Sequence, residues 1–328
     1  MKIAATDPRL VLRGALRSAN ADGWLRVDRP TTDDGGLSAD APGATLELVT
    51  DAVALIVHLR RNGRHTRRDA VDGTVVLTCG GAVVATGAVP ASGPAAYDWA
   101  IPLPKADGPR ALRFHFPYAE SVDCGGFTLN DGARVVPAGP EPARPRWLAC
   151  GDSITQGFRA SSLLGTYPAL VGARRGWSVL NAGIGGRFAE AVDGEALAAI
   201  PADLVTILLG YNDYFQQRSP ADTRDQLAGM IRALRRGGPA RRPIVVITPL
   251  WSSEDAPKHR GLGLEAYRVA AAEAVAAVAD PSLRLLDGLS LLPAWPELFT
   301  DGIHPTDAGF RLLADNLARV LPDPAIIV

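Results

Sequence analysis

The chain has 328 residues, of which 47% are hydrophobic, and this content can fill the cores of about two domains. Its 34 Lys and Arg residues nearly balance 35 Asp and Glu residues, so no global field attracts nucleic acid or an anionic membrane. The first residues lack the apolar segment of a secretion signal, and no run is long enough to span a membrane. We therefore expect a globular, cytoplasmic protein whose partner is neither nucleic acid nor a membrane.

The cysteine and histidine positions do not predict a metal site. The three cysteines form an odd, sparse set without C-x-x-C spacing, which suits neither a disulfide framework nor zinc: Cys79, Cys124 and Cys150. The histidines of the first half have no acidic or cysteine partner at ligand spacing. Neither a Gly-x-Gly-x-x-Gly fingerprint nor a P-loop opens a helix in the second half. We expect no metal and no cofactor.

The first 140 residues predict an all-β sandwich. Between residues 9 and 136, short apolar runs alternate with Gly, Asp, Pro and Asn, and none is long and periodic enough for a helix. The Asp131-Gly132 pair between FTLN and ARVVP predicts a hairpin with a type I′ turn. Trp24 and Trp99 could stack on a sugar face, or they could fill the core of the sandwich, which is the commoner use of such residues.

A proline-rich stretch, PAGPEPARPR, separates the two halves of the chain. Proline cannot donate to a strand ladder and favours extended polyproline II geometry, so this stretch is typical of a stiff connector. We therefore predict one domain over residues 1–140 and a second over residues 141–328.

The second half alternates between strand and helix patterns. The runs at 178–180, 204–209, 244–248 and 283–286 are apolar without polar alternation, as expected of strands covered on both faces. Apolar residues spaced three and four apart lie between them and predict amphipathic helices. This alternation predicts a three-layer α/β domain with a parallel sheet, whose ligand crevice lies beyond the carboxyl ends of the strands.

Those strand ends carry residues suited to catalysis. GDS places Ser153 at a strand-to-helix corner, NAGIGG includes Gly186, LGYND places Asn212, and DGIHP brings Asp301 and His304. A serine at such a corner is exposed beside the N–H groups of the following turn. Ser153 and Gln156 also fit a capping box, in which the hydroxyl only satisfies a helix N–H.

The order of these four segments resembles the SGNH hydrolases, also called the GDSL esterases and lipases, over residues 147–321. The resemblance implies that Ser153 is the nucleophile, His304 the base and Asp301 its partner. It also implies an oxyanion hole formed by the N–H groups of Ser153 and Gly186 and the amide of Asn212. Ile154 replaces the Leu of the GDSL motif, and Gly185 adjoins Gly186, so the oxyanion glycine could be either one.

The two-part arrangement is also similar to that of carbohydrate esterases and some acyltransferases of this family, which implies a jelly-roll-like sandwich before the hydrolase domain. We therefore predict an esterase acting on a small acyl ester, such as an acetyl group on a sugar or another polyol. The alternatives are an acyltransferase that uses a small-molecule alcohol, and a carbohydrate-binding protein with a vestigial enzyme domain.

Two aromatic residues near the strand ends are candidates for substrate binding. Tyr211 precedes Asn212, and Trp251 follows the apolar run IVVITPL, so both are expected at the mouth of the crevice. They could equally be packing residues under the loops. No feature of the sequence predicts an oligomeric state.

Overall fold

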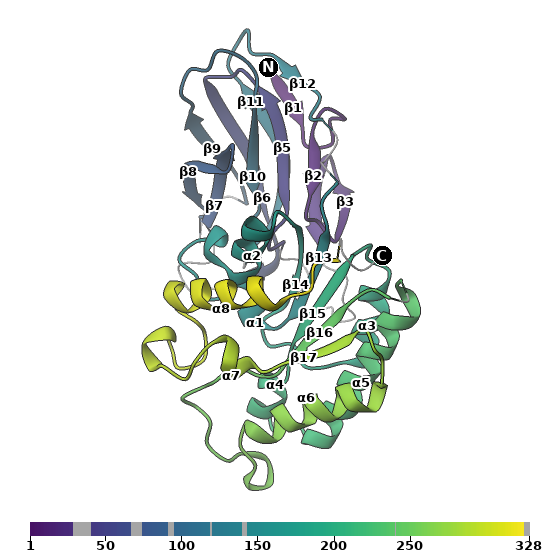
Figure 1. Ribbon diagram of the computed structural model, residues 1–328. Coiled ribbons are helices and arrows are strands. Elements are labelled where there is room, and N and C mark those ends of the chain that lie inside the picture. Colours follow the sequence, from purple (N-terminus) through teal and green to yellow (C-terminus); the bar gives the residue numbers. More distant parts are fainter. Residues whose placement is uncertain are drawn as a thin grey trace. The chain divides into compact units, whose positions relative to one another are not determined.

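The computed structural model describes residues 1–28, 41–66, 74–90, 95–118, 120–139, 143–239 and 241–324. The chain divides between Ala143 and Arg144 into two compact units, which we call the N-terminal and the C-terminal unit (Figure 1). Over the ranges just given, no helix has both the length and the apolar character needed to cross a membrane.

The N-terminal unit consists of two antiparallel sheets. One sheet contains β1 (Lys2–Ala4), β3 (Arg17–Ala21), β4 (Trp24–Asp28), β6 (Ala54–Thr66), β9 (Ala96–Pro102) and β11 (Glu120–Leu129). The other contains β2 (Val11–Arg13), β5 (Thr45–Thr50), β7 (Thr74–Cys79), β8 (Ala82–Ala88), β10 (Arg110–His115) and β12 (Val135–Val136). Alternate apolar side chains of both sheets form one buried core, so the predicted all-β sandwich is confirmed.

The tryptophans of this unit differ in their surroundings. Trp99 packs against the core, and a Cβ added to Gly87 would lie 2.6 Å from its ring, so Trp99 is a packing residue. Trp24 is half-buried, and the guanidinium of Arg60 lies 4.8 Å from the centroid of its ring. Neither ring is a bare platform of the kind that stacks on sugars.

The predicted hairpin at Asp131-Gly132 is wrong. Strand β11 lies in one sheet and β12 pairs with β5 in the other, so the turn carries the chain across the sandwich. Of the two turn residues only Gly132 has a positive φ, whereas a type I′ turn needs both. The side chain of Asn130 accepts the N–H groups of Val53 and Ala54, which holds the turn by a contact that the local sequence does not show.

The C-terminal unit contains a five-stranded parallel sheet in the order β14-β13-β15-β16-β17. The strands are β13 (Arg146–Gly151), β14 (Ser178–Gly183), β15 (Leu204–Leu208), β16 (Ile244–Ile247) and β17 (Leu283–Leu286). The helices are α1 (Ser153–Gln156), α2 (Tyr167–Arg175), α3 (Ala191–Ala198), α4 (Tyr211–Phe215), α5 (Pro220–Gly237), α6 (Glu265–Val278), α7 (Gly288–Leu291) and α8 (Asp307–Val320). Short 3-10 turns lie at Leu163–Gly165, His259–Gly261 and Pro296–Leu298.

Helices cover both faces of this sheet (Figure 1). Because strand side chains alternate, Trp147 and Ala149 of β13 face α2 and α8 in one core, while Leu148 points to the opposite face and is also buried. Helices α3, α5 and α6 pack in sequence on that opposite side. The predicted three-layer α/β architecture is confirmed.

The topology gathers the carboxyl ends of the strands at one edge of the sheet, and the short helices α1 and α4 start there. Close approach of α1 to β14 depends on Gly183, because a Cβ at that position would lie 2.1 Å from the backbone nitrogen of Gln156. Helix α1 is thereby held directly over the end of β14.

Candidate active site

Ser153 lies at the first position of α1, directly after the corner that follows β13. The N-cap residue is Asp152, whose side chain accepts the N–H of Ile154 at 3.0 Å. The side chain of Gln156 accepts the N–H of Gly185 at 2.8 Å. The capping-box interpretation of Ser153 is therefore wrong, and its hydroxyl is available for another partner.

That partner is His304. The Oγ atom of Ser153 lies 2.8 Å from Nε2 of His304, and Nδ1 of His304 lies 2.9 Å from Oδ2 of Asp301. A carboxylate can only accept, so Nδ1 carries the proton and Nε2 accepts the hydrogen bond of the serine hydroxyl. Burial opposes ionisation of Asp301, but hydrogen bonds from the ring and backbone N–H of His304 hold its pKa below the ordinary range. Asp301 is therefore a carboxylate at neutral pH.

Phe158 and Arg159, which follow α1, contact the residues of this hydrogen-bonded chain. The ring of Phe158 meets the imidazole of His304 edge to face, with centroids 4.6 Å apart. The Nε atom of Arg159 lies 3.4 Å from Oδ2 of Asp301, and its guanidinium lies 4.7 Å from the centroid of the Phe158 ring. Arg159 has a φ of 75°, a conformation rare for a side chain of its size. The sequence alone offers no signal for either contact.

The three groups predicted to donate to a negative oxygen lie in α1, in the loop after β14 and in α4: the N–H groups of Ser153 and Gly186 and the amide of Asn212. The N–H of Ser153 is in the first turn of α1, where backbone N–H groups have no partner within the helix. The N–H of Gly185 bonds to Gln156, whereas the N–H of Gly186 makes no hydrogen bond to any residue that the structure describes. Of the two adjacent glycines, Gly186 is thus the one with a free donor. The amide of Asn212 donates to the carbonyl of Arg187 at 3.1 Å, which places Asn212 beside this loop.

A small, mostly apolar pocket adjoins the serine. Its lining includes Asp152 and Ile154, which flank Ser153, and Ile303, which precedes His304. Tyr211 and Trp251 also line it, so both predicted aromatic residues border the same pocket as the two residues that flank the serine. Trp251 additionally packs on Phe299, with ring centroids 5.1 Å apart, so it is both a lining and a packing residue.

The pKa of the carboxyl group of Asp152, next to the serine in the chain, is shifted in the opposite direction from that of Asp301. It is 2% exposed, and burial raises its pKa to about 6, although the Ile154 N–H and nearby His304 act in the opposite direction. Within the described ranges, no three His, Cys, Asp or Glu side chains converge as ligands for a metal ion. Ser153, His304 and Asp301 thus form one hydrogen-bonded group, and α1, which carries Ser153, is bonded through Gln156 to the loop that carries Gly186.

The chain is similar to known proteins in sequence family and in fold. The model of the GDSL-like Lipase/Acylhydrolase family matches residues 149–312. A salicylyl-acyltransferase from a tetracycline biosynthetic pathway has 21% identity and a TM-score of 0.84, with 97% of this chain and 96% of that chain covered. A family two carbohydrate esterase from Clostridium thermocellum, in complex with cellohexaose, has 16% identity and a TM-score of 0.72, with 94% and 97% covered.

A family two carbohydrate esterase from Cellvibrio japonicus has 15% identity and a TM-score of 0.71, with 97% of this chain and 96% of that chain covered. No curated protein matches the chain in sequence. At these identities the structural likeness establishes the fold, and the family follows from the sequence match, which spans half of the chain and includes Ser153, Asn212 and His304. The chain belongs to the GDSL-like lipase/acylhydrolase family, among the SGNH hydrolases.

Proposed function

We propose that this protein is a serine esterase that hydrolyses small acyl esters, such as an acetyl group on a sugar or another polyol, through an acyl-serine intermediate. The observation that carries the proposal is the continuous hydrogen-bonded chain from Ser153 through His304 to Asp301. A serine hydroxyl is a weak nucleophile at neutral pH, and a base within hydrogen-bond reach removes its proton as it attacks.

In the first half of the reaction, Oγ of Ser153 attacks the ester carbonyl carbon and its proton passes to Nε2 of His304. The carboxylate of Asp301 stabilises the resulting imidazolium and keeps the ring in the required tautomer. The imidazolium then gives its proton to the leaving alcohol as the bond between acyl carbon and alcohol oxygen breaks. The acyl group remains on Ser153, and His304 is again neutral.

The tetrahedral intermediate carries its negative charge on the former carbonyl oxygen. In this proposal the N–H groups of Ser153 and Gly186 and the amide of Asn212 donate to that oxygen. Removing one such donor typically lowers kcat by about 10²–10³-fold. The second half repeats these steps with water as the nucleophile, so that a carboxylic acid leaves and the serine is restored.

A second candidate function is acyl transfer to an alcohol, which resolves the same acyl-serine intermediate. The likeness of the whole chain to a salicylyl-acyltransferase favours this candidate. The aromatic pocket lining supports it as well, because Tyr211 and Trp251 are suited to contact a ring that displaces water. The third candidate, a carbohydrate-binding protein with a vestigial enzyme, has less support, since binding alone needs no hydrogen-bonded serine and histidine.

The test of the proposal is hydrolysis of p-nitrophenyl acetate by the full chain and by variants. We expect Ser153→Ala and His304→Ala each to lower kcat by about 10³-fold or more, since loss of any member of such a group disables the whole. Ser161→Ala is the matched control, because its hydroxyl bonds to Asp307 at an exposed position eight residues along the chain. Full activity of Ser153→Ala would rule the proposal out.

A further inference from the structure

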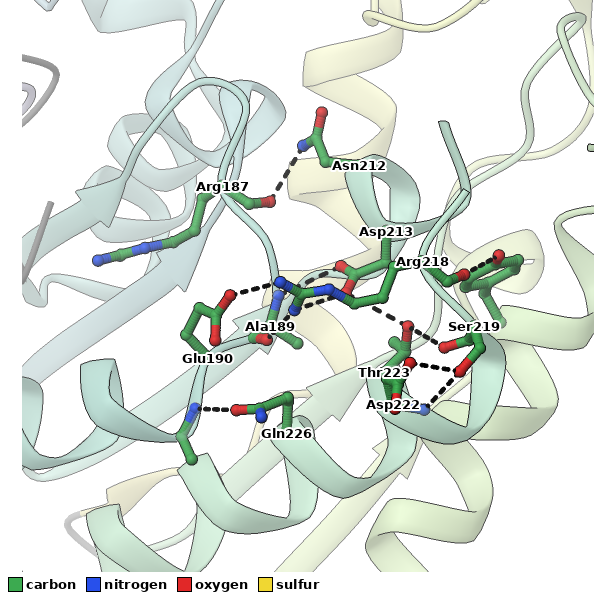
Figure 2. A network of polar contacts seen from close by, with 12 residues as sticks. Arg187, Ala189, Glu190, Asn212, Asp213, Arg218, Ser219, Asp222, Thr223 and Gln226 are labelled. Atoms are coloured by element: carbon green, nitrogen blue, oxygen red, sulfur yellow. Dashed lines mark hydrogen bonds and ion pairs between the residues drawn. The ribbon is translucent and has the colours of Figure 1, made fainter. Parts of the chain in front are cut away.

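The loop that carries Gly186 is held by a buried polar cluster from two other helical segments, and this cluster takes no part in the steps above. It consists of Asp213 in α4, Arg218 after α4, Thr223 in α5, and Glu190 at the end of the loop (Figure 2). Asp213 is completely buried, and it directly follows Asn212 in the chain. The cluster therefore bonds to the loop that carries Gly186 and includes the residue that follows Asn212.

Asp213 is satisfied mainly by the loop and by the segments behind it. Its Oδ2 accepts the backbone N–H of Ala189 at 3.2 Å. Its Oδ1 lies 3.2 Å from the hydroxyl of Thr223 and 3.4 Å from Nη1 of Arg218. Burying a carboxylate costs free energy unless it is paired and hydrogen-bonded. Moving any of these partners would leave Asp213 unsatisfied, so the carboxylate holds its partners in place and they hold it.

Arg218 holds the same loop from its other side. Its Nη1 donates to the carbonyl of Ala189 at 2.9 Å, and its Nη2 donates to the carboxylate of Glu190 at 2.6 Å. Its guanidinium also lies 4.5 Å from the centroid of the Phe188 ring. The N–H of Ala189 belongs to the 188–189 peptide and its carbonyl to the 189–190 peptide, so one buried acid and one arginine hold both peptide groups that flank its Cα.

The remaining residues of the loop are bound as well. The N–H of Gly185 is held by Gln156, the carbonyl of Arg187 by Asn212, and the side chain of Arg187 by a buried ion pair with Asp193 at 2.9 Å. Gly186, with a φ of 81°, lies between two fixed neighbours. Its N–H direction is therefore set by the turn from Ile184 to Arg187, in which the N–H of Arg187 donates to the carbonyl of Ile184 at 3.1 Å, and by the contacts that hold this turn from outside.

We infer that Arg218 and Asp213 are positioning residues that hold the proposed oxyanion donors, Gly186 and Asn212, in place for the attack of Ser153 on the ester carbonyl. The inference rests on the proposed function. Donors contribute to catalysis when they point at the developing charge before the reaction starts, and errors of about 0.5 Å in a site already matter. Arg218 contacts neither the serine nor the proposed substrate carbonyl, so it acts only through the loop.

The experiment compares Arg218→Gln with Arg224→Gln, which removes a half-exposed arginine of α5 that pairs with Asp225 and with Glu273 of α6. Both variants are assayed for kcat and KM with p-nitrophenyl acetate, for the rate of phosphonylation by an organophosphonate, and for Tm. We expect Arg218→Gln to lower kcat and the phosphonylation rate by about 10-fold with KM little changed, because the lost contacts act mainly in the transition state. Arg224→Gln should match the wild type in all of them.

Two further variants keep the test decisive if Arg218→Gln does not fold. Thr223→Val keeps the shape of the side chain and removes one hydrogen-bond donor to Asp213, and Arg218→Lys keeps the charge but cannot bridge Ala189 and Glu190 as a fork does. We expect both to lower kcat by about 2- to 5-fold. This effect is smaller than the loss of kcat that follows removal of a whole oxyanion donor, because the donors are still present but less well oriented. In the Asn212→Ala background, either change should lower kcat by a smaller factor than in the wild type. The reason is that one of the donors positioned by the cluster is already gone.

The outcomes separate this inference from the proposed function. A wild-type protein that neither hydrolyses the ester nor reacts with the phosphonate at Ser153 contradicts the proposed function. A wild-type protein that reacts at Ser153, together with folded Arg218→Gln and Thr223→Val proteins that react equally fast, contradicts only the positioning role. Lower Tm with unchanged kcat and phosphonylation rate would make the cluster purely structural and also overturn the inference.

Discussion

At the scale of single residues, the sequence predicts the proposed nucleophile and its partners but not their surroundings. Ser153, Asp301 and His304 each stand in a short segment whose order along the chain is informative, and the structure joins them through two hydrogen bonds. The contact between Gly185 and Gln156 joins residues 29 positions apart, and that between Arg159 and Asp301 joins residues 142 apart. No local pattern encodes such pairs, because they depend on how the strands are arranged.

Asp152 provides a test of how burial acts beside the serine. Burial raises its pKa to about 6 from an ordinary value of 3.8, so ionisation is disfavoured in the folded protein. Its contribution to the free energy of unfolding is full below about pH 4 and is lost as the pH rises through about 6. Asp152→Asn keeps an oxygen for the Ile154 N–H and cannot ionise.

As the pH rises from about 4 to about 8, the free energy of unfolding should fall in the wild type because Asp152 ionises. We therefore expect this fall to be smaller in Asp152→Asn, by about 1–3 kcal/mol. Urea denaturation at a series of pH values measures this difference. Asp225→Asn, which alters an exposed aspartate, is the control and should follow the wild type closely. A constant difference between Asp152→Asn and the wild type at every pH would show that Asp152 is not perturbed by burial.

At the scale of helices and strands, apolar runs in the sequence predict those strands that are buried along their whole length. The apolar runs at 204–209 and 244–248 contain β15 and β16, which are buried throughout. Strand β9 and the first half of β11 do not stand out in the sequence as continuous apolar runs. In β11, Asp123 is completely buried because Arg26 of β4 and Arg60 of β6 pair with it, and a polar residue buried by distant partners does not look like part of a strand.

Gly183 tests whether the position of α1 on β14 matters for catalysis. In Gly183→Ala, the new Cβ would lie 2.1 Å from the Gln156 nitrogen and 2.5 Å from the Thr155 carbonyl carbon, and both atoms belong to the backbone of α1. We expect a loss of stability of at least about 1–3 kcal/mol and a lower kcat, because α1 carries Ser153 and must shift. Thermal unfolding and ester hydrolysis measure the two effects.

Gly165→Ala is the matched control for that substitution. The nearest atom to a Cβ at Gly165 is 3.9 Å away, which is an ordinary contact distance, so stability and kcat should stay close to those of the wild type. If the two glycine variants behaved alike, the close approach of α1 to β14 would not be what holds Ser153 in place.

At the scale of the whole molecule, the fold does not decide between water and an alcohol as the acyl acceptor. The chain resembles both carbohydrate esterases and an acyltransferase along nearly its full length. In the proposed mechanism, the acceptor is selected at the pocket near the serine. A ring bound there would exclude water, and the hydroxyl group of that ring would lie near the acyl carbonyl. Such proximity can lower the barrier by about 7–11 kcal/mol in favourable cases.

The partition between hydrolysis and transfer is measurable with an activated acetyl ester and a panel of sugars and phenolic glycosides. As an esterase, the protein should release nearly all acetyl groups as acetate, and dominant transfer to one acceptor would favour the acyltransferase. Trp251→Ala should change the ratio of acetate to acetylated acceptor more than it changes Tm, because Trp251 lines the pocket. An unchanged ratio would remove Trp251 from the acceptor site.

The central claim is that Ser153 becomes covalently modified during turnover. The most direct measurement is treatment of the full chain with an organophosphonate, followed by digestion and peptide mapping by mass spectrometry. We predict a single adduct on Ser153, and no adduct in His304→Ala on the same time scale, because Nε2 of His304 accepts the serine proton. An adduct on another serine, with Ser153 unmodified, would contradict the account.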